Sequence, residues 1–107
     1  MPSAADYIDN VRKYSSNASE DTVGKIVKHL GIALQSKDAS LVSCSDKSEL
    51  ERVREKWLKK KLALSDSDAD LDAAIGEICQ TMSAERQKQR VTFYYLLAAK
   101  YEKLGTL

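Results

Sequence analysis

The chain has 107 residues, of which 43% are hydrophobic and 31% are charged, a composition too apolar for a disordered chain and too polar for a membrane protein. Its net charge of +1 excludes a long-range field that would draw the whole molecule to nucleic acid or anionic lipid. The first ten residues carry acids where a signal peptide needs a basic start and an apolar middle. We therefore expect a cytoplasmic, single helical domain over residues 1–107, with no membrane association, no metal and no cofactor.

Apolar spacings of three and four residues recur five times along the chain, and this pattern predicts five short helices. The first is expected at about residues 4–14, after a few disordered residues. The second should begin after the N-cap residue Ser19 and end near Gln35. Gly24 and Gly31 lie two turns apart along it, so we expect another helix to cross closely at that edge.

A polar loop is expected at residues 36–45, where Leu41 and Val42 anchor the chain in the core. Asp46 and Glu49 have the spacing of a capping box, in which each side chain accepts a hydrogen bond from a free amide of the first turn. A third helix should therefore begin there. The buried stripe of this helix is expected to consist of Leu50, Val53, Trp57 and Leu58.

A fourth helix is expected after the link at residues 62–67, with Ser65 or Ser67 as its N-cap and an almost unbroken apolar seam. The fifth, at about residues 88–104, is apolar nearly all the way round, as is typical of a helix surrounded by others, and Gly105 should end it. The sequence thus predicts an all-α, compact single-domain bundle of about five short helices with the C-terminal helix at its centre.

Three long segments carry a resemblance to a known family: GIALQSKDASLVSCSD from Gly31, LKKKLALSDSDADLDAAI from Leu58 and RVTFYYLLAAKYEKL from Arg90. Together they resemble a family of short bacterial proteins, the domain of unknown function 2853. The resemblance covers all but the first few residues. It implies a small stand-alone bacterial protein, and it implies no substrate, cofactor or catalytic residue.

The first candidate site is the loop formed by Ser43, Cys44 and Ser45, which precedes the third predicted helix. Free amides at a helix start lower the pKa of a thiol or hold an anion, so this loop predicts a thiol- or anion-responsive protein. The alternative is that Cys44 is a small buried hydrophobe and that the serines turn and cap the chain. We interpret Cys44 and Cys79 as free thiols, because they are far apart in sequence and a cytosolic pool keeps cysteines reduced.

The second candidate site consists of two basic runs: Lys59, Lys60 and Lys61, and Arg86, Lys88 and Arg90. If these runs shared one surface with Tyr94 or Tyr95 as a stacking face, the chain would bind nucleic acid weakly. The alternative is that both runs are solvated helix ends and that the tyrosines belong to the core. The near-zero net charge favours this alternative, since phosphate contacts dominate nucleic-acid affinity.

Metal binding and catalysis find little support in the sequence. Five acidic residues occupy positions of a calcium-loop template: Asp66, Asp68, Asp70, Asp72 and Glu77. Leu71 stands where that template needs glycine, so we interpret the run as a helix start whose aspartates interact with the helix dipole. His29 is the only histidine and is expected to be exposed, and no catalytic triad or glycine-rich phosphate loop is recognisable.

Elimination favours a small protein-interaction module without catalytic activity. The fifth helix has more apolar circumference than four short helices cover, so we expect part of Phe93, Tyr94 or Tyr95 to face a second copy or another protein. Weak nucleic-acid binding through the two basic runs is the alternative. A thiol- or anion-responsive role of the Cys44 loop is a further one.

Overall fold

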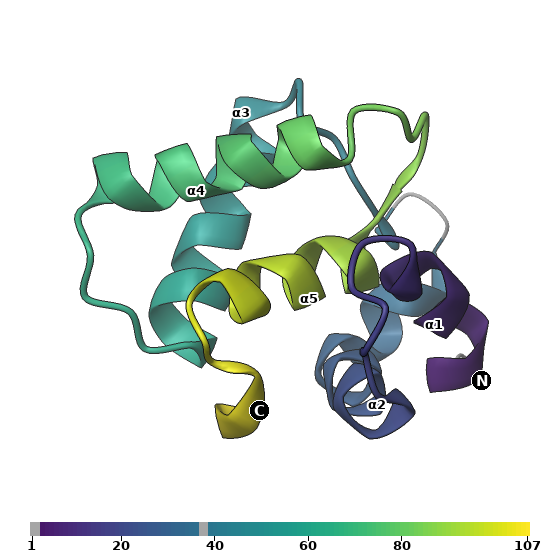
Figure 1. Cartoon of the computed structure of the whole chain (residues 1–107). Helices are drawn as coiled ribbons and strands as arrows, with labels where there is room; N and C mark the ends of the chain where they lie inside the picture. The colour runs from purple at the N-terminus through teal and green to yellow at the C-terminus, as the bar shows by residue number, and fades with distance from the viewer. Residues whose placement is uncertain (1–2, 37–38) are drawn as a thin grey trace.

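The helices of this protein pack around one central helix, and a computed structural model describes residues 3–36 and 39–107 (Figure 1). The described elements are α1 (Ala4–Arg12), α2 (Glu20–Leu30), the 3₁₀ segment η1 (Gly31–Gln35), β1 (Leu41–Val42), α3 (Lys47–Arg52), the π-helix η2 (Val53–Lys61), α4 (Asp68–Thr81), β2 (Lys88–Gln89), α5 (Arg90–Lys100) and the 3₁₀ segment η3 (Leu104–Thr106). The radius of gyration is 12.6 Å. The prediction of a compact, mostly α-helical bundle is confirmed.

Helix α5 lies at the centre of this bundle, and it contacts α1, α2, α4, η2 and both strands. In Figure 1 it runs across the middle of the molecule, below α4 and above α2. Every residue from Arg90 to Ala98 is buried, and the exposed fractions of Phe93, Tyr94 and Tyr95 are 0%, 6% and 3%. The prediction that one of these rings faces a partner is wrong, because η2 and the small sheet cover the part of α5 that four regular helices would leave open.

The N-terminal ends of the helices follow the capping chemistry of the sequence. Ser19 accepts a hydrogen bond from the Thr22 amide at 3.2 Å, and Ser67 caps α4 in the same way. Asp46 accepts from the Ser48 amide at 2.9 Å and from the Glu49 amide at 3.4 Å. Only this half of the expected capping box forms, because the Glu49 side chain turns inward to an ion pair.

Two helix ends differ from the sequence-based expectation. Helix α2 ends at Leu30 because Gly31 adopts a left-handed φ of 49°, and the chain continues as the 3₁₀ segment η1. The expected close crossing exists only at Gly24, where an added Cβ would lie 3.7 Å from the Ala4 Cβ. At the other end of the chain, Glu102 ends α5 with a φ of 56°, so the expectation that Gly105 ends this helix is wrong.

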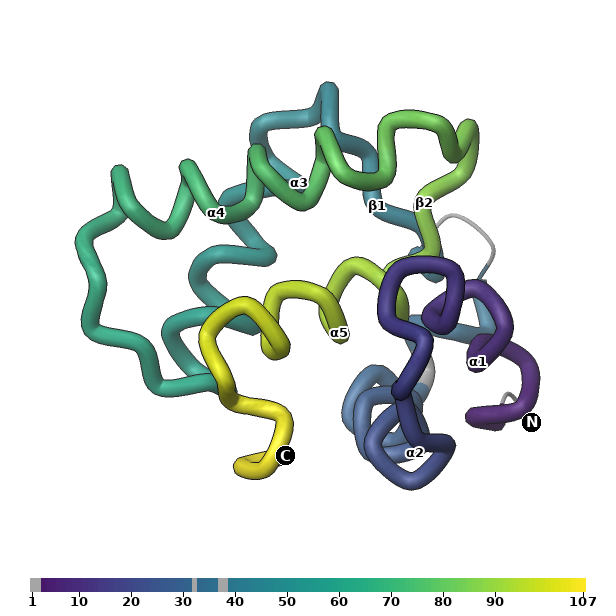
Figure 2. The backbone as a smooth tube through the Cα atoms, in the orientation of Figure 1, coloured from purple at the N-terminus to yellow at the C-terminus, as the bar shows by residue number. Residues whose placement is uncertain are grey.

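The two short strands were not predicted. Leu41 pairs with Gln89 and Val42 with Lys88 in an antiparallel ladder, and Figure 2 shows β1 and β2 side by side. Two-residue strands are too short to show an alternating pattern in the sequence. Val42 is buried at 5% exposure, as expected of an anchor. Residues 37–38 of the predicted loop, and residues 1–2 of the segment expected to be disordered, lie outside the described residues.

In the described part of the chain, no helix combines the length and the apolar character that crossing a bilayer requires.

Candidate functional site

A continuous basic stripe runs along the outside of α3 and η2. Helix α3 leads directly into η2, where the Leu62 amide donates to the Trp57 carbonyl five residues earlier at 2.9 Å. This wider π-helical turn brings residues four and five positions apart onto one side. The buried side follows that spacing with Val53, Trp57, Leu58 and Leu62. The basic residues Arg52, Lys56 and Lys61 each come one residue before a member of this set, and Lys60 lies four residues after Lys56.

These basic residues line an open hollow between two parts of the chain, α2 with η1 and α3 with η2. One end of it, which we call the tyrosine end, has a volume of about 580 Å³ and is lined by His29, Leu30, Ala33, Ser36, Ala39, Glu49, Arg52, Lys56, Arg90 and Tyr94. The other, the lysine end, has a volume of about 540 Å³ and is lined by His29, Lys56, Lys60 and Lys61. Because His29 and Lys56 line both ends, the two ends adjoin each other, and we refer to them together as the basic hollow.

Arg90 forms the floor of the tyrosine end and is 9% exposed. Its Nη2 donates to the Glu49 carboxylate and, at 3.1 Å, to the Leu41 carbonyl. Its Nε donates to the Ala39 carbonyl at 2.7 Å, and its Nη1 donates to the Tyr94 hydroxyl at 3.2 Å. The interpretation of Arg90 as a solvated helix-end residue is therefore wrong, since every side of its guanidinium is held by the protein.

The single acidic residue among the described lining residues is neutralised twice. Glu49 is 8% exposed, and its second carboxylate oxygen accepts a hydrogen bond from Arg52 Nη2 at 2.9 Å. Two guanidinium groups thus share one buried carboxylate. The remaining charge of the described lining comes from lysine ammonium groups.

Three aromatic rings, those of Tyr94, Trp57 and His29, contact one another in turn beside the hollow. Trp57 Nε1 donates to the Tyr94 carbonyl at 3.1 Å, and the two rings stack with centroids 4.5 Å apart. The His29 ring lies 5.2 Å from the Trp57 ring. His29 is exposed, as predicted, and partial burial and the neighbouring Lys61 charge lower its pKa below the usual 6.5. At neutral pH the imidazole is therefore neutral.

The three lysines of the hollow differ from their neighbour Lys59. Lys59 bonds to the Asp68 carboxylate at 2.6 Å and to the Glu55 carboxylate at 2.9 Å, which raises its pKa. Lys56, Lys60 and Lys61 have no carboxylate within 4.0 Å among residues 3–36 and 39–107. The unpaired positive charge of this stretch thus faces the hollow, and Lys59 faces α4.

The second basic run contributes one residue, Arg90, to the described lining of the hollow. Arg86 is exposed in the turn before β2, and Lys88 donates to the Glu85 carbonyl at 3.0 Å. Arg90 is the one residue of this run that lines the hollow, from below. Tyr94 and Tyr95 are buried, so neither offers the free ring face that base stacking needs.

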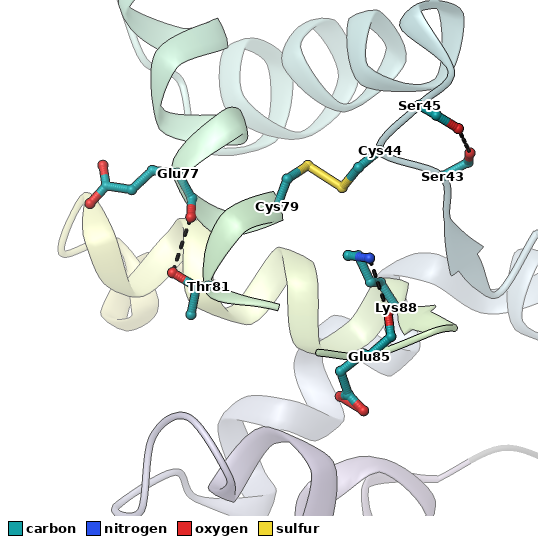
Figure 3. Close-up of a disulfide and its surroundings, with 8 residues drawn as sticks. All are labelled: Ser43, Cys44, Ser45, Glu77, Cys79, Thr81, Glu85 and Lys88. Atoms are coloured by element: carbon teal, nitrogen blue, oxygen red, sulfur yellow. Dashed lines mark hydrogen bonds between the residues drawn. A yellow bond between two sulfur atoms is a disulfide. The ribbon is translucent and has the colours of Figure 1, made fainter. Parts of the chain in front are cut away.

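The Cys44 loop contains a disulfide, which Figure 3 shows between the turn after β1 and helix α4. Cys44 and Cys79 are bonded, with Cα atoms 6.0 Å apart, so the free-thiol interpretation is wrong. The fold brings together two cysteines that are 35 residues apart, and their spacing gave no signal of this. The Ser43 and Ser45 hydroxyls lie 3.2 Å apart and bond to each other. The Asp46 side chain occupies the amides that an anion would need.

Several acidic residues of the calcium template form ion pairs with basic side chains. Asp68 bonds to Lys59, Asp72 accepts from Arg54 Nη1 at 3.0 Å, and Glu77 bonds to Lys100 at 2.7 Å. Asp68 and Asp72 also share Arg54, so these carboxylates are paired with basic side chains instead of converging on one centre. Throughout the described residues, no cluster of three His, Cys, Asp or Glu side chains has metal-binding geometry.

The fold and the hollow define a small helical protein with an open basic hollow of ligand size. The chain belongs to the family described as "Protein of unknown function (DUF2853)", whose pattern matches residues 6–105. No match to a curated protein was found. The resemblance seen in the three sequence segments is therefore confirmed, and it brings no assigned activity with it.

Sequence reasoning missed most of the hollow. The sequence pattern predicts an exposed His29 and a capping role for Glu49, and it singles out neither Arg52 nor Lys56. A signal was nevertheless present, because the basic positions 52, 56 and 61 have the same four-and-five spacing as the apolar positions 53, 57 and 62. That shared spacing is the pattern of a π-helix with a buried side and a basic side.

Proposed function

We propose that this protein binds a small anionic ligand in the basic hollow. The observation that carries the proposal is the convergence of Lys56, Lys60 and Lys61 on the lysine end, without a carboxylate partner among the described residues. Like charges held together raise one another's energy, and an anion between them relieves this repulsion and accepts charge-assisted hydrogen bonds. The neutral imidazole of His29 beside them adds a further polar group without adding charge at neutral pH.

The dimensions of the hollow support a small ligand. Small-molecule sites have volumes of roughly 300–1,000 Å³, and each end of the hollow falls within this range. A nucleic-acid backbone needs a basic groove that follows many phosphates. Lys59 and Arg90 of the predicted basic patch are engaged by protein carboxylates, which leaves too short a track for such a groove.

The interaction-module hypothesis loses its main structural support, since the α5 rings that were expected to face a partner are buried. The Cys44 loop likewise has no free thiol to respond with. Both remain testable by sedimentation and by thiol titration, and neither has a feature as specific as the three lysines that lack a carboxylate partner in the described ranges.

Isothermal titration calorimetry with inorganic pyrophosphate at low ionic strength tests the proposal. The wild-type protein should bind at one saturable site, and affinity should fall as salt is raised. The triple variant Lys56→Ala/Lys60→Ala/Lys61→Ala should bind at least tenfold more weakly. A charge-matched control, Lys25→Ala/Lys28→Ala/Arg86→Ala, removes three exposed bases outside the hollow and should bind as the wild type does.

Two results would contradict the proposal. An equal loss of affinity in both triple variants would show that net charge, and not the hollow, attracts the anion. Binding of a single-stranded oligonucleotide that pyrophosphate does not displace would favour the nucleic-acid alternative instead.

A further inference from the structure

The two ends of the basic hollow differ in chemistry. The tyrosine end has an apolar wall of Leu30, Ala33 and Ala39, and the charged residues Glu49, Arg52, Lys56 and Arg90 line it as well. The described lining of the lysine end consists of His29 and three lysines, without an aliphatic residue. A ligand that occupied both ends would therefore meet aliphatic side chains at the tyrosine end alone.

Charge favours a dianionic head at the lysine end. Glu49 is already shared by Arg90 and Arg52, so it does not balance the lysines. A phosphate monoester carries a charge of about −1.5 to −2 at neutral pH and three acceptor oxygens, whereas a monocarboxylate carries one charge and two oxygens. Three ammonium groups without a carboxylate partner among the described residues match the phosphate ester more closely, both in charge and in having one terminal oxygen for each group.

The apolar wall favours an organic part on that phosphate. An inorganic anion held by Lys60 and Lys61 would leave the tyrosine end to water. A ring or short chain attached to the phosphate would cover Leu30 and Ala33 and gain the free energy of apolar burial. His29 and Lys56 line both ends, so the two ends adjoin, and such a ligand would reach from one to the other past these two side chains.

From these observations we infer that the ligand is an organic phosphate monoester, with its phosphate at the lysine end and an apolar organic part at the tyrosine end. This inference rests on the proposed function, since it assigns the ligand class of the same hollow. It adds a requirement that simple charge attraction does not make, namely that the organic part contributes to affinity.

Calorimetry with 1-naphthyl phosphate, inorganic phosphate and 1-naphthoate separates the contributions of the phosphate group and of the organic part to affinity. We expect 1-naphthyl phosphate to bind at least tenfold more tightly than each of the other two. Ala33→Phe fills the apolar end and should abolish this advantage while inorganic phosphate still binds. Ala84→Phe places the same side chain on an exposed turn outside the hollow and should leave all three affinities unchanged.

A second measurement does not depend on a variant. Nuclear Overhauser contacts between naphthyl protons and the Leu30 methyl groups are expected in the wild-type complex. Equal affinities for naphthyl and inorganic phosphate, without these contacts, would overturn the ligand class and leave the anion-binding proposal standing. Tight binding of 1-naphthoate would overturn the preference for phosphate, and failure of pyrophosphate and all three probes to bind would remove the proposed function itself.

Discussion

Arg90 on α5 and Glu49 on α3 form an ion pair that is buried beneath the basic hollow. Through the same guanidinium group, Arg90 also holds the backbone carbonyls of Ala39 and Leu41. The segment at residues 39–41 and helix α3 are thereby both fixed to α5 at one point. The position of Arg52, which bonds to the other oxygen of Glu49, depends on this pair.

Removing one partner of the pair is expected to destabilise the fold strongly. Arg90→Leu leaves a buried carboxylate short of one partner and two carbonyls without their donor, and breaking a buried ion pair costs about 3–5 kcal/mol. The free energy of unfolding, measured by urea denaturation and followed by Trp57 fluorescence, should fall by about that amount. Arg86→Leu, at an exposed site, should change it by less than about 0.5 kcal/mol. A loss below about 1 kcal/mol for Arg90→Leu would contradict the pair's structural role.

The disulfide between Cys44 and Cys79 is expected to contribute substantially to stability. Closing a loop with a sequence separation of 35 restricts the unfolded chain by about 4 kcal/mol in the chain-entropy description. The free energy of unfolding in urea should be lower with a dithiol reductant than without it, by up to this amount. The double variant Cys44→Ser/Cys79→Ser should show no effect of the reductant, and two alkylatable thiols in the native, unreduced protein would disprove the bond.

His29 is expected to make stability depend on pH near neutrality. Its pKa in the folded protein is lowered below 6.5 by burial and by Lys61, so the unfolded chain takes up the proton first as the pH falls. The stabilising contribution is therefore complete above about pH 6.5 and is lost as the pH falls through the folded-state pKa. The free energy of unfolding between pH 8 and 5 should decrease less in His29→Gln. Identical pH profiles for the two proteins would show that the shift is absent.

Substitution by alanine should lower the stability of the fold at Gly31 and raise it at Gly76. Gly31 has a φ of 49° at the end of α2, so Gly31→Ala strains the backbone and should cost about 1 kcal/mol. Gly76 lies inside α4, and an added Cβ there meets no atom within 4 Å among the described residues, so Gly76→Ala should stabilise by up to about 1 kcal/mol. Thermal melts of the two variants compare them directly, and stabilisation by Gly31→Ala would contradict the left-handed helix end.

Local features of the fold were predictable from the sequence, because they depend on neighbours along the chain. Ser19, Asp46 and Ser67 cap helices since their side chains reach amides two or three residues ahead. The central position of α5 followed from its apolar circumference, which no surface helix has. These inferences used spacing alone, and the structure confirms them.

The hollow could not be predicted in the same way, because it depends on contacts between distant segments. Glu49 fitted a local capping box, yet its carboxylate bonds to Arg90, 41 residues away. Cys44 and Cys79 meet only after β1 and α4 have packed. The sequence of η2 is compatible with a solvated basic run, and only the folded π-helix places Lys56, Lys60 and Lys61 beside His29.

Chemical-shift mapping of the ¹⁵N-labelled protein with inorganic pyrophosphate tests the basic hollow most directly. Our account predicts saturable shifts that are largest at residues 29–33 and 52–61, the two segments that face each other across the hollow. Shifts spread evenly over exposed basic residues such as Lys13 and Lys25, or no saturable shift at all, would contradict it.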